Sequence, residues 1–180
     1  MILNPNLRGQ VLPMPVVLIS TISKDGILNA APWGCIMPIL RPLDKIAIAS
    51  WLKRDTLDNI RETGEFVVNV PTVEMTEAVD TCAKSFPPEV DEFKEASLSL
   101  HPSTKVRPPG IKGCVAWMEC ELVEEILREN FSLIVGRVVH LEGDDDFFDE
   151  KGGMDFEKAK PMSMIMGPDG ACYTHPTSKP

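Results

Sequence analysis

The length, composition and charge of the chain indicate an ordinary globular protein. Its 180 residues are 43% hydrophobic and 25% charged, a balance that predicts one domain over residues 1–180 with one sizeable core. With 27 acidic and 18 basic residues the formal net charge is -9, and the lack of a long basic block excludes nucleic acid as a partner. Any anion must therefore be held by a local group of donors.

The chain opens without the pattern of a secretory leader and holds no apolar run near the ~20 residues that cross a bilayer. We therefore expect a cytoplasmic protein without a membrane partner. The 5 cysteines form no CxxC and the 3 histidines are scattered, so we assign neither a disulfide framework nor a metal site. Most of the cysteines are expected to be buried.

The first predicted elements are strands. "PVVLIST" at 15–21 and "GILNAAP" at 26–32 flank Asp25-Gly26, which can supply the positive φ of a hairpin turn. "KIAIAS" at 45–50 predicts a buried strand.

A helix and another strand follow. "DTLDNIRETG" at 55–64 predicts a short helix that buries Leu57 and Ile60, with Gly64 as a left-handed C-cap. "EFVVNV" at 65–70 predicts a strand.

The second half of the chain is again mainly β. A helical stripe at 72–86 and an irregular connection at 105–110 precede two long strand-like runs, 114–126 and 131–142, which should pair as a hairpin. The acidic segment 142–153 is expected to be a solvated excursion. Hairpins, few helices and one core predict a mainly β protein, an antiparallel barrel that removes exposed sheet edges by closing on itself.

The stretch "WLKRDT" is a candidate anion site. Asp55 or Thr56 can cap the predicted helix, while the remaining N–H groups and the helix dipole favour a bound phosphate. Arg54 can add a bidentate contact, Lys53 a point charge and Ser50 a hydroxyl. The alternative is a capped helix with two solvated cations.

The stretch "NAAPWGC" is a candidate platform for a planar ligand. Asn29 offers an amide, Ala30 and Ala31 allow close approach to the backbone, Pro32 stiffens the loop and Trp33 supplies a flat apolar face. The alternative is a strand that ends in a turn with a core tryptophan.

Several segments, in order, resemble one family over about Pro13 to His140. They are "PMPVVLIST", "DGILNAAPWG", "WLKRDTLDNIRETGEFVVNVP", "VDEFKEASLSL" and "FSLIVGRVV". These are similar to the flavin reductase-like family of FMN-binding split barrels, which includes flavoredoxin. The resemblance implies a Greek-key antiparallel split barrel, a homodimer, and non-covalent FMN near the subunit interface. Trp33, Trp51 and Trp117 suit an interface as well as a barrel interior.

The resemblance also implies which residues hold FMN. Those expected along the isoalloxazine are Asn29, Ala30, Ala31, Pro32 and Trp33, and those expected around the phosphate and ribityl chain are Ser50, Leu52, Lys53, Arg54, Asp55 and Thr56. Two positions depart from the pattern, since Glu92 replaces a lysine of some members and Phe131 a frequent histidine. Lys84 or Lys94 can replace the missing cation.

The implied function is an oxidoreductase that accepts hydride from NADH or NADPH and passes electrons to free flavin, a metal centre or a redox partner. Flavin supplies this chemistry, so we assign no catalytic side chain. One alternative is an FMN electron carrier without a nicotinamide site, and another is a split barrel that binds pyridoxal phosphate or haem. The segments "NAAPWG" and "TLDNI" favour flavin, and the lack of GxGxxG favours FMN over FAD.

Overall fold

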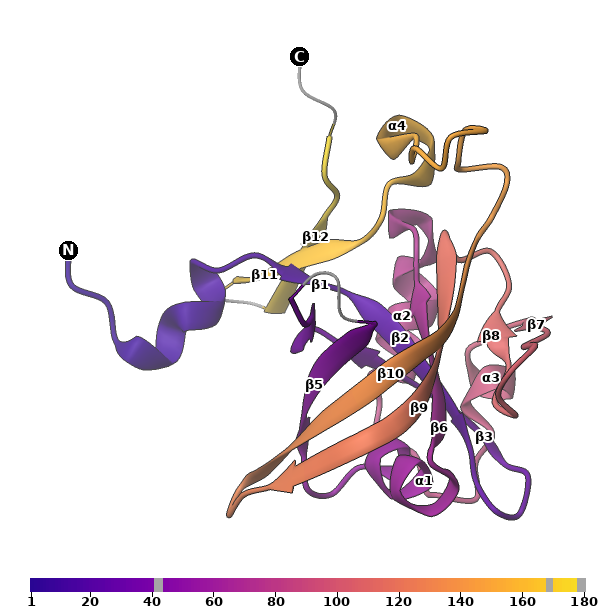
Figure 1. Ribbon diagram of the computed structural model, residues 1–180. Coiled ribbons are helices and arrows are strands. Elements are labelled where there is room, and N and C mark those ends of the chain that lie inside the picture. The colour runs from indigo at the N-terminus through magenta and orange to yellow at the C-terminus, as the bar shows by residue number, and fades with distance from the viewer. Residues whose placement is uncertain (41–43, 168–169, 178–180) are drawn as a thin grey trace.

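The computed structural model describes residues 1–40, 44–167 and 170–177, which form mostly strands (Figure 1). The strands are β1 Met14–Pro15, β2 Val17–Ile22, β3 Leu28–Trp33, β4 Ile36–Pro38, β5 Lys45–Trp51, β6 Glu65–Val70, β7 Leu100–His101, β8 Gly110–Ile111, β9 Ala116–Leu127, β10 Phe131–Gly143, β11 Ser163–Gly167 and β12 Gly170–Thr174. The α-helices are α1 Asp55–Thr63, α2 Thr76–Cys82, α3 Glu92–Glu95 and α4 Phe156–Ala159, with 3-10 helices at Pro5–Gln10 and Val73–Met75.

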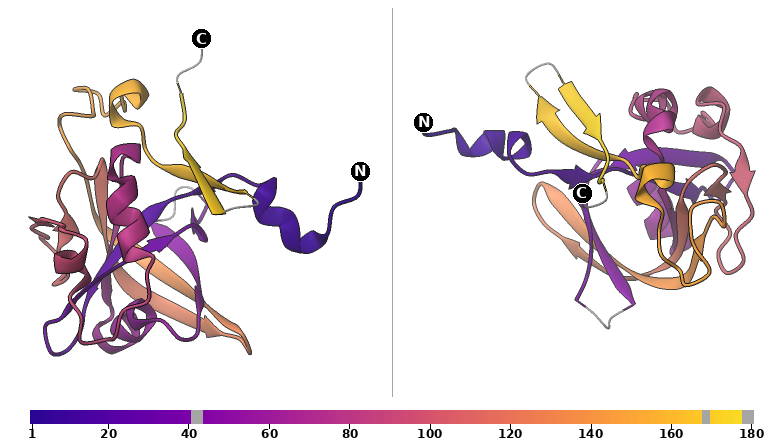
Figure 2. Two further views of the ribbon diagram at one scale, coloured as in Figure 1. Left: turned by 180° about the vertical axis from the view of Figure 1, so that it is seen from behind. Right: turned by 90° about the horizontal axis from the view of Figure 1, so that it is seen from above.

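A seven-stranded antiparallel sheet in the order β3-β2-β6-β9-β10-β5-β4 forms the body of the molecule. The two predicted hairpins are confirmed, because β2 pairs with β3 and β9 pairs with β10. Gly26 has φ +85 in the first turn, as the Asp-Gly signal predicts. The sheet is strongly curled, and in the view from above β9 and β10 curve around one side of the molecule (Figure 2).

The sheet is buried on both faces at its centre, which explains the continuous apolar runs of β2 and β6. One face packs Ile19, Phe66 and Val68 with Leu57 and Ile60 of α1. The other face packs residues under α2 and α3, among them Leu18, Val67, Val79, Phe93 and Trp117. A strand covered on both sides cannot alternate apolar and polar residues, so β2 and β6 show no period of two.

The predicted barrel is present, but its hydrogen-bonded ladder does not close. β3 and β4 are the two ends of the strand order. The predicted removal of sheet edges by closure is therefore wrong. β3 and β4 follow each other through Gly34-Cys35, which turn the chain from one end of the sheet to the other. Between β3 and β5, the Trp33 indole Nε1 donates a 2.8 Å hydrogen bond to the Ala49 carbonyl, so a side chain bridges this opening.

Helix α1 follows the prediction in its length and C-terminus but not in its cap. Leu57 and Ile60 are buried, and Gly64 ends the helix with φ 73. The predicted cap by Asp55 or Thr56 is wrong, because the N-cap is Arg54 and no side chain accepts a hydrogen bond there. The Thr56 hydroxyl donates instead to Asn29 Oδ1 at 2.8 Å, because Thr56 is buried against β3 and has a better-placed acceptor.

The helix predicted at 72–86 is shorter than expected. A 3-10 turn at Val73–Met75 leads into α2, which ends at Cys82. Phe86 precedes Pro87, and a residue before proline is disfavoured in the α conformation. The segment 84–86 follows the helix and borders the candidate site described below.

Outside the main sheet, the N-terminal 3-10 helix, β1, β11 and β12 project to one side of the molecule (Figure 1). In the acidic segment Asp145, Asp146 and Asp149 are exposed as expected, while Phe148 packs back toward Gly143. Cys82, Cys114 and Cys120 are buried, so the expectation for most cysteines is confirmed. Among the described helices, none has both the length and the apolar character to cross a membrane.

Candidate functional site

A first cavity lies at the opening of the barrel, where Trp33 of β3 hydrogen-bonds to Ala49 of β5, and we call it the tryptophan cavity. It has a volume of about 230 Å³, and Trp33 and Trp51 are its large rings. The other residues along it are Ala31, Pro32, Gly34, Cys35, Ala49, Arg54, Cys82 and Ala83. The Trp33 ring is held by its bond to Ala49, whereas Trp51 is 68% exposed at the rim. The cavity is therefore mainly apolar and walled by flat rings, as a planar ligand requires.

A second cavity, the cationic cavity, adjoins the first. It has a volume of about 160 Å³ and shares Ala31, Arg54 and Cys82 with the tryptophan cavity. Its remaining lining consists of Asn29, Lys53, Asp55, Thr56, Lys84, Ser85, Phe86 and Glu92. Three cations meet here in a chain of net charge -9, because the start of α1 and the segment after α2 face the same space.

The start of α1 at this cavity is rich in hydrogen-bond donors. The first N–H groups of a helix have no partner within the helix, and no side chain caps them here. Their partial positive charge adds to that of Lys53, Arg54 and Lys84. Together these groups suit an anion such as a phosphate ester.

A buried polar network fixes the floor of the cationic cavity. Asn29 Oδ1 accepts hydrogen bonds from the hydroxyls of Thr56 (2.8 Å) and Thr21 (3.2 Å), and Thr21 Oγ1 accepts one from Asn59 (3.0 Å). The Asn29 amide donates a 2.6 Å bond to Glu92 Oε2. Strand β3, helix α1 and helix α3 are thus joined through one amide side chain.

Glu92 is the least expected member of this site. It is 7% exposed, and its Oε2 also accepts a 2.7 Å bond from the Ala30 N–H at the edge of β3. Burial raises the pKa of Glu92 to about 7, against the lowering effect of the Ala30 bond, and Asp55 adds to the rise. The Cys82 thiol has its pKa raised to about 12 by burial and by Glu92.

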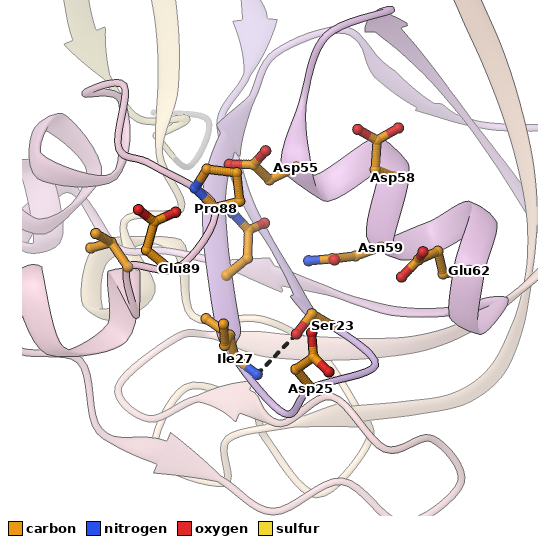
Figure 3. Close-up of a pocket in the computed structure, with 11 residues that line it drawn as sticks. Ser23, Asp25, Ile27, Asp55, Asp58, Asn59, Glu62, Pro88 and Glu89 are labelled. Carbon is orange, nitrogen blue, oxygen red and sulfur yellow. Dashed lines mark hydrogen bonds between the residues drawn. The ribbon is translucent and has the colours of Figure 1, made fainter.

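A third cavity, on the other side of Asn29 and Asp55, has the opposite charge. It has a volume of about 360 Å³ and is lined by the carboxylates of Asp25, Asp55, Asp58, Glu62 and Glu89. Figure 3 shows the side chains of α1 on one side of this cavity and Pro88 and Glu89 on the other. This acidic cavity would repel a phosphate, so the smaller cationic cavity is the better candidate for an anion site.

The structure gathers most of the residues that the sequence nominated. Those that line the two adjoining cavities are Asn29, Ala31, Pro32, Trp33, Lys53, Arg54, Asp55 and Thr56. Ala30, Ser50 and Leu52 line neither of them. Ala30 is fully buried and supplies only its N–H to Glu92, and the Ser50 hydroxyl donates to the Trp51 carbonyl.

Some lining residues were left undecided or missed by the sequence. Of the two lysines considered, Lys84 lines the cationic cavity and Lys94 pairs with Asp91 at 3.1 Å. Trp51 and Cys82 were not nominated, and the sequence signal that could have found Trp51 is its position next to the cationic pair Lys53-Arg54. His101 stacks on Trp117 with 3.7 Å between ring centroids. Within the described ranges, no three His, Cys, Asp or Glu side chains are grouped to hold a metal ion.

Comparison with solved structures defines the class of fold. The structure of nitrilotriacetate monooxygenase component B from Bacillus cereus matches with a TM-score of 0.87 and 27% identity, over 99% of this chain and 96% of that chain. Flavoredoxin from Methanosarcina acetivorans matches with a TM-score of 0.86 and 24% identity, over 100% of this chain and 92% of that chain. The fold is the Greek-key antiparallel split barrel.

Sequence comparison then defines the family. The model of the flavin reductase like domain matches residues 8–162, and the chain belongs to the flavin reductase-like family. A protein of Methanothermobacter thermautotrophicus is 51% identical over 170 residues, covering 92% of this chain and 80% of that protein. Family membership supports a redox function connected with flavin.

Proposed function

We propose that this chain is a flavoprotein oxidoreductase that binds FMN without a covalent link. The phosphate lies in the cationic cavity and the isoalloxazine ring in the tryptophan cavity. The holoprotein accepts hydride from NADH or NADPH and passes electrons to free flavin, a metal centre or a redox protein. FMN supplies the redox chemistry.

The observation that carries this proposal is the adjacency of two unlike cavities. The uncapped start of α1, with Lys53, Arg54 and Lys84, offers the donors that a phosphate dianion needs. The neighbouring space is apolar and is bordered by Trp33 and Trp51. A ligand with one phosphate and one planar ring system fits both, whereas a dinucleotide would require a second anion site.

The work of the protein residues is binding and orientation. Asn29 and Thr56 hold β3 against the start of α1 by a 2.8 Å bond, which sets the distance between the ring site and the anion site. Because FMN supplies the redox chemistry, this role of the protein residues needs no acid or base among the side chains.

We propose in addition that the functional unit is a homodimer. The outer face of β5 and β10 carries apolar residues in directly opposed pairs, Trp51 with Phe131, Leu133 with Ala49 and Val135 with Ala47. Trp51 and Phe131 are 68% and 41% exposed. A second copy placed on this outer face would cover the rings and, through Trp51, complete the wall of the tryptophan cavity.

The cofactor site is tested by the substitution Arg54→Ala. Loss of a charge-assisted bond to the phosphate costs roughly 1.5–3 kcal/mol, so FMN affinity should fall about 10- to 150-fold in a fluorescence titration. Riboflavin, which has no phosphate, should bind the variant and the native protein alike. Arg128→Ala, at an exposed position of the β9–β10 turn, is the matched control and should leave both affinities unchanged.

Two outcomes would contradict this site. Equal weakening of FMN and riboflavin would indicate a general structural effect of the substitution, and unchanged FMN affinity would leave Lys53 and Arg54 as solvated cations at a helix start. The donor is tested separately, since steady oxidation of NADH or NADPH by the purified holoprotein supports the oxidoreductase. Reduction by an added redox protein alone would instead support an electron carrier.

A further inference from the structure

Glu92 places a carboxyl group in the wall of a cavity that three cations line. It is the first residue of α3, and α3 packs against the edge strand β3. Lys53, Arg54 and Lys84 border the same cavity. An ionised carboxylate is an unfavourable neighbour for a phosphate dianion, because like charges repel strongly where water is partly excluded.

We propose that Glu92 couples the binding of a phosphate ester in the cationic cavity to the uptake of one proton, an inference that rests on the proposed function. The protonated carboxyl group is the form that accompanies the bound phosphate, and the ionised form accompanies the empty cavity at alkaline pH. Affinity for the phosphate ester therefore depends on pH through this residue.

The hydrogen bonds around Glu92 allow this change of charge. The Asn29 amide and the Ala30 N–H both donate to the same oxygen, Oε2, at 2.6 and 2.7 Å. A proton on Oε1 leaves both bonds in place, so the carboxyl can change its charge without releasing β3. The protonated oxygen also gains a donor, which a phosphate oxygen can accept.

The charged groups that act on Glu92 are Asp55, Arg54 and Asp91. Burial raises the pKa of Glu92 to about 7. Burial raises the pKa of Asp55 at the start of α1, and it raises the pKa of Cys82 on α2 to about 12. The charge of Arg54 lowers the pKa of Glu92 and the charge of Asp91 raises it, and β3, with the sequence LNAAPW, contributes no ionisable side chain.

The sign of the effect follows from the charges. Above the pKa of Glu92, binding of a dianion must first restore the proton, so affinity falls as pH rises, by at most about tenfold per pH unit. A free phosphate monoester has its second pKa near ~6, so its own titration makes affinity rise with pH below neutrality. The two effects oppose each other. At alkaline pH the phosphate is already a dianion, so the pH dependence of affinity that remains there is that of Glu92.

The test is the affinity of FMN and of riboflavin at several pH values between about 7 and 9, a range in which one linked proton can change affinity by up to about 50-fold. We expect FMN to bind at least about fivefold more weakly at the upper limit, while riboflavin affinity stays nearly constant. Calorimetry in buffers of different ionisation enthalpy should show uptake of up to one proton per FMN bound at the alkaline end.

Glu92→Gln should abolish both the slope and the proton uptake, because a glutamine oxygen can accept the two bonds that Oε2 accepts and cannot ionise. Asp91→Asn is the matched control. It removes the same charge one residue away and keeps an N-cap of similar strength for α3, and it should leave the slope unchanged.

Three results would overturn the inference. They are an FMN affinity that does not vary with pH, an equal slope for riboflavin, and an unchanged slope in Glu92→Gln. The buffer dependence measured on the native protein decides the question even if Glu92→Gln does not fold. FMN binding that is tight but independent of pH removes this inference alone, whereas no FMN binding at any pH removes the proposed function as well.

Discussion

Two buried glutamates show how residues of one type acquire opposite properties. Glu92 is 7% exposed and Glu119 is 2% exposed. Burial alone would raise both pKa values, yet the pKa of Glu119 is lowered, because its carboxylate accepts the N–H groups of Thr104, Lys105 and Val106 and the Thr104 hydroxyl. Glu92 accepts bonds on one oxygen only, so burial prevails and the pKa rises to about 7. The number of hydrogen bonds donated to the ionised carboxylate therefore decides whether the pKa of a buried glutamate is raised or lowered.

At this scale we predict that Glu92 makes the stability of the protein without cofactor depend on pH. A raised pKa in the folded state means that its contribution is fully present below the unfolded value of 4.5 and is lost as pH rises through about 7. Glu92→Gln should therefore stabilise the protein at alkaline pH, by up to about 3 kcal/mol, and have little effect in acid. Urea denaturation at several pH values measures this difference.

Glu119→Gln provides the comparison for that experiment. The lowered pKa of Glu119 contributes stability above its unfolded value, and the contribution is lost as pH falls. The Glu119→Gln variant should thus be destabilised at neutral pH and approach the native protein in acid. The same pH trend in both variants would contradict the assignment of the two environments.

At the scale of an element, strand β10 passes close to the ring of Phe66 at Gly136. Its pairing with β9 shifts between Val135 and Gly136, and Gly136 faces the fully buried ring of Phe66 on β6. A methyl group at Gly136 would lie 2.5 Å from Cζ of Phe66. Glycine is required here for space, since its φ is not among the positive values.

We therefore predict that Gly136→Ala destabilises the protein by about 1–3 kcal/mol, the usual cost of overpacking a core. The ring of Phe66 cannot move outward because it is fully buried. Phe66→Leu in the Gly136→Ala background should recover part of the loss, and urea denaturation of the single and double variants measures the coupling. Strict additivity of the two substitutions would show that the contact is not the cause.

At the scale of the whole molecule, the apolar outer face of β5 and β10 is what the proposed homodimer explains. Burial alternates along β5 and along residues 131–137 of β10, with Ile46, Ile48 and Ser50 turned inward on β5 and Ala47, Ala49 and Trp51 turned outward. An outward apolar row is unusual for a sheet face in water. A second copy would remove that surface from water.

We predict that Phe131→Glu together with Leu133→Glu converts the protein to a monomer. Two charges on the outer face would have to be buried without partners in the dimer, which disfavours association strongly. Analytical ultracentrifugation at micromolar concentration measures the change in mass. Leu100→Glu, at a position 54% exposed on β7, is the control and should remain dimeric. A native protein that is monomeric with FMN bound would refute the shared site.

Local chemistry let the sequence determine the main strands, helix α1 and most of the candidate site. The Asp25-Gly26 turn, the Gly64 C-cap and the long strand runs depend on neighbouring residues, so their patterns are visible in one dimension. The nominated segments around Trp33 and Arg54 lie next to each other because the two ends of the sheet approach. The helix predicted at 72–86 is too long, and no element was predicted for α3, α4 or the hairpin of β11 and β12.

Long-range contacts were decided only by the tertiary structure. The Thr56 hydroxyl donates to Asn29, 27 residues away in the sequence, and does not cap the helix. Glu92 accepts a hydrogen bond from the N–H of Ala30, 62 residues away. Three further features depend in the same way on which elements meet. They are the position of Lys84 rather than Lys94 at the cationic cavity, the opening between β3 and β4, and the exposure of Trp51 but not of Trp117. A side chain selects the best-placed partner in space, and a sequence by itself does not give the distances among which it selects.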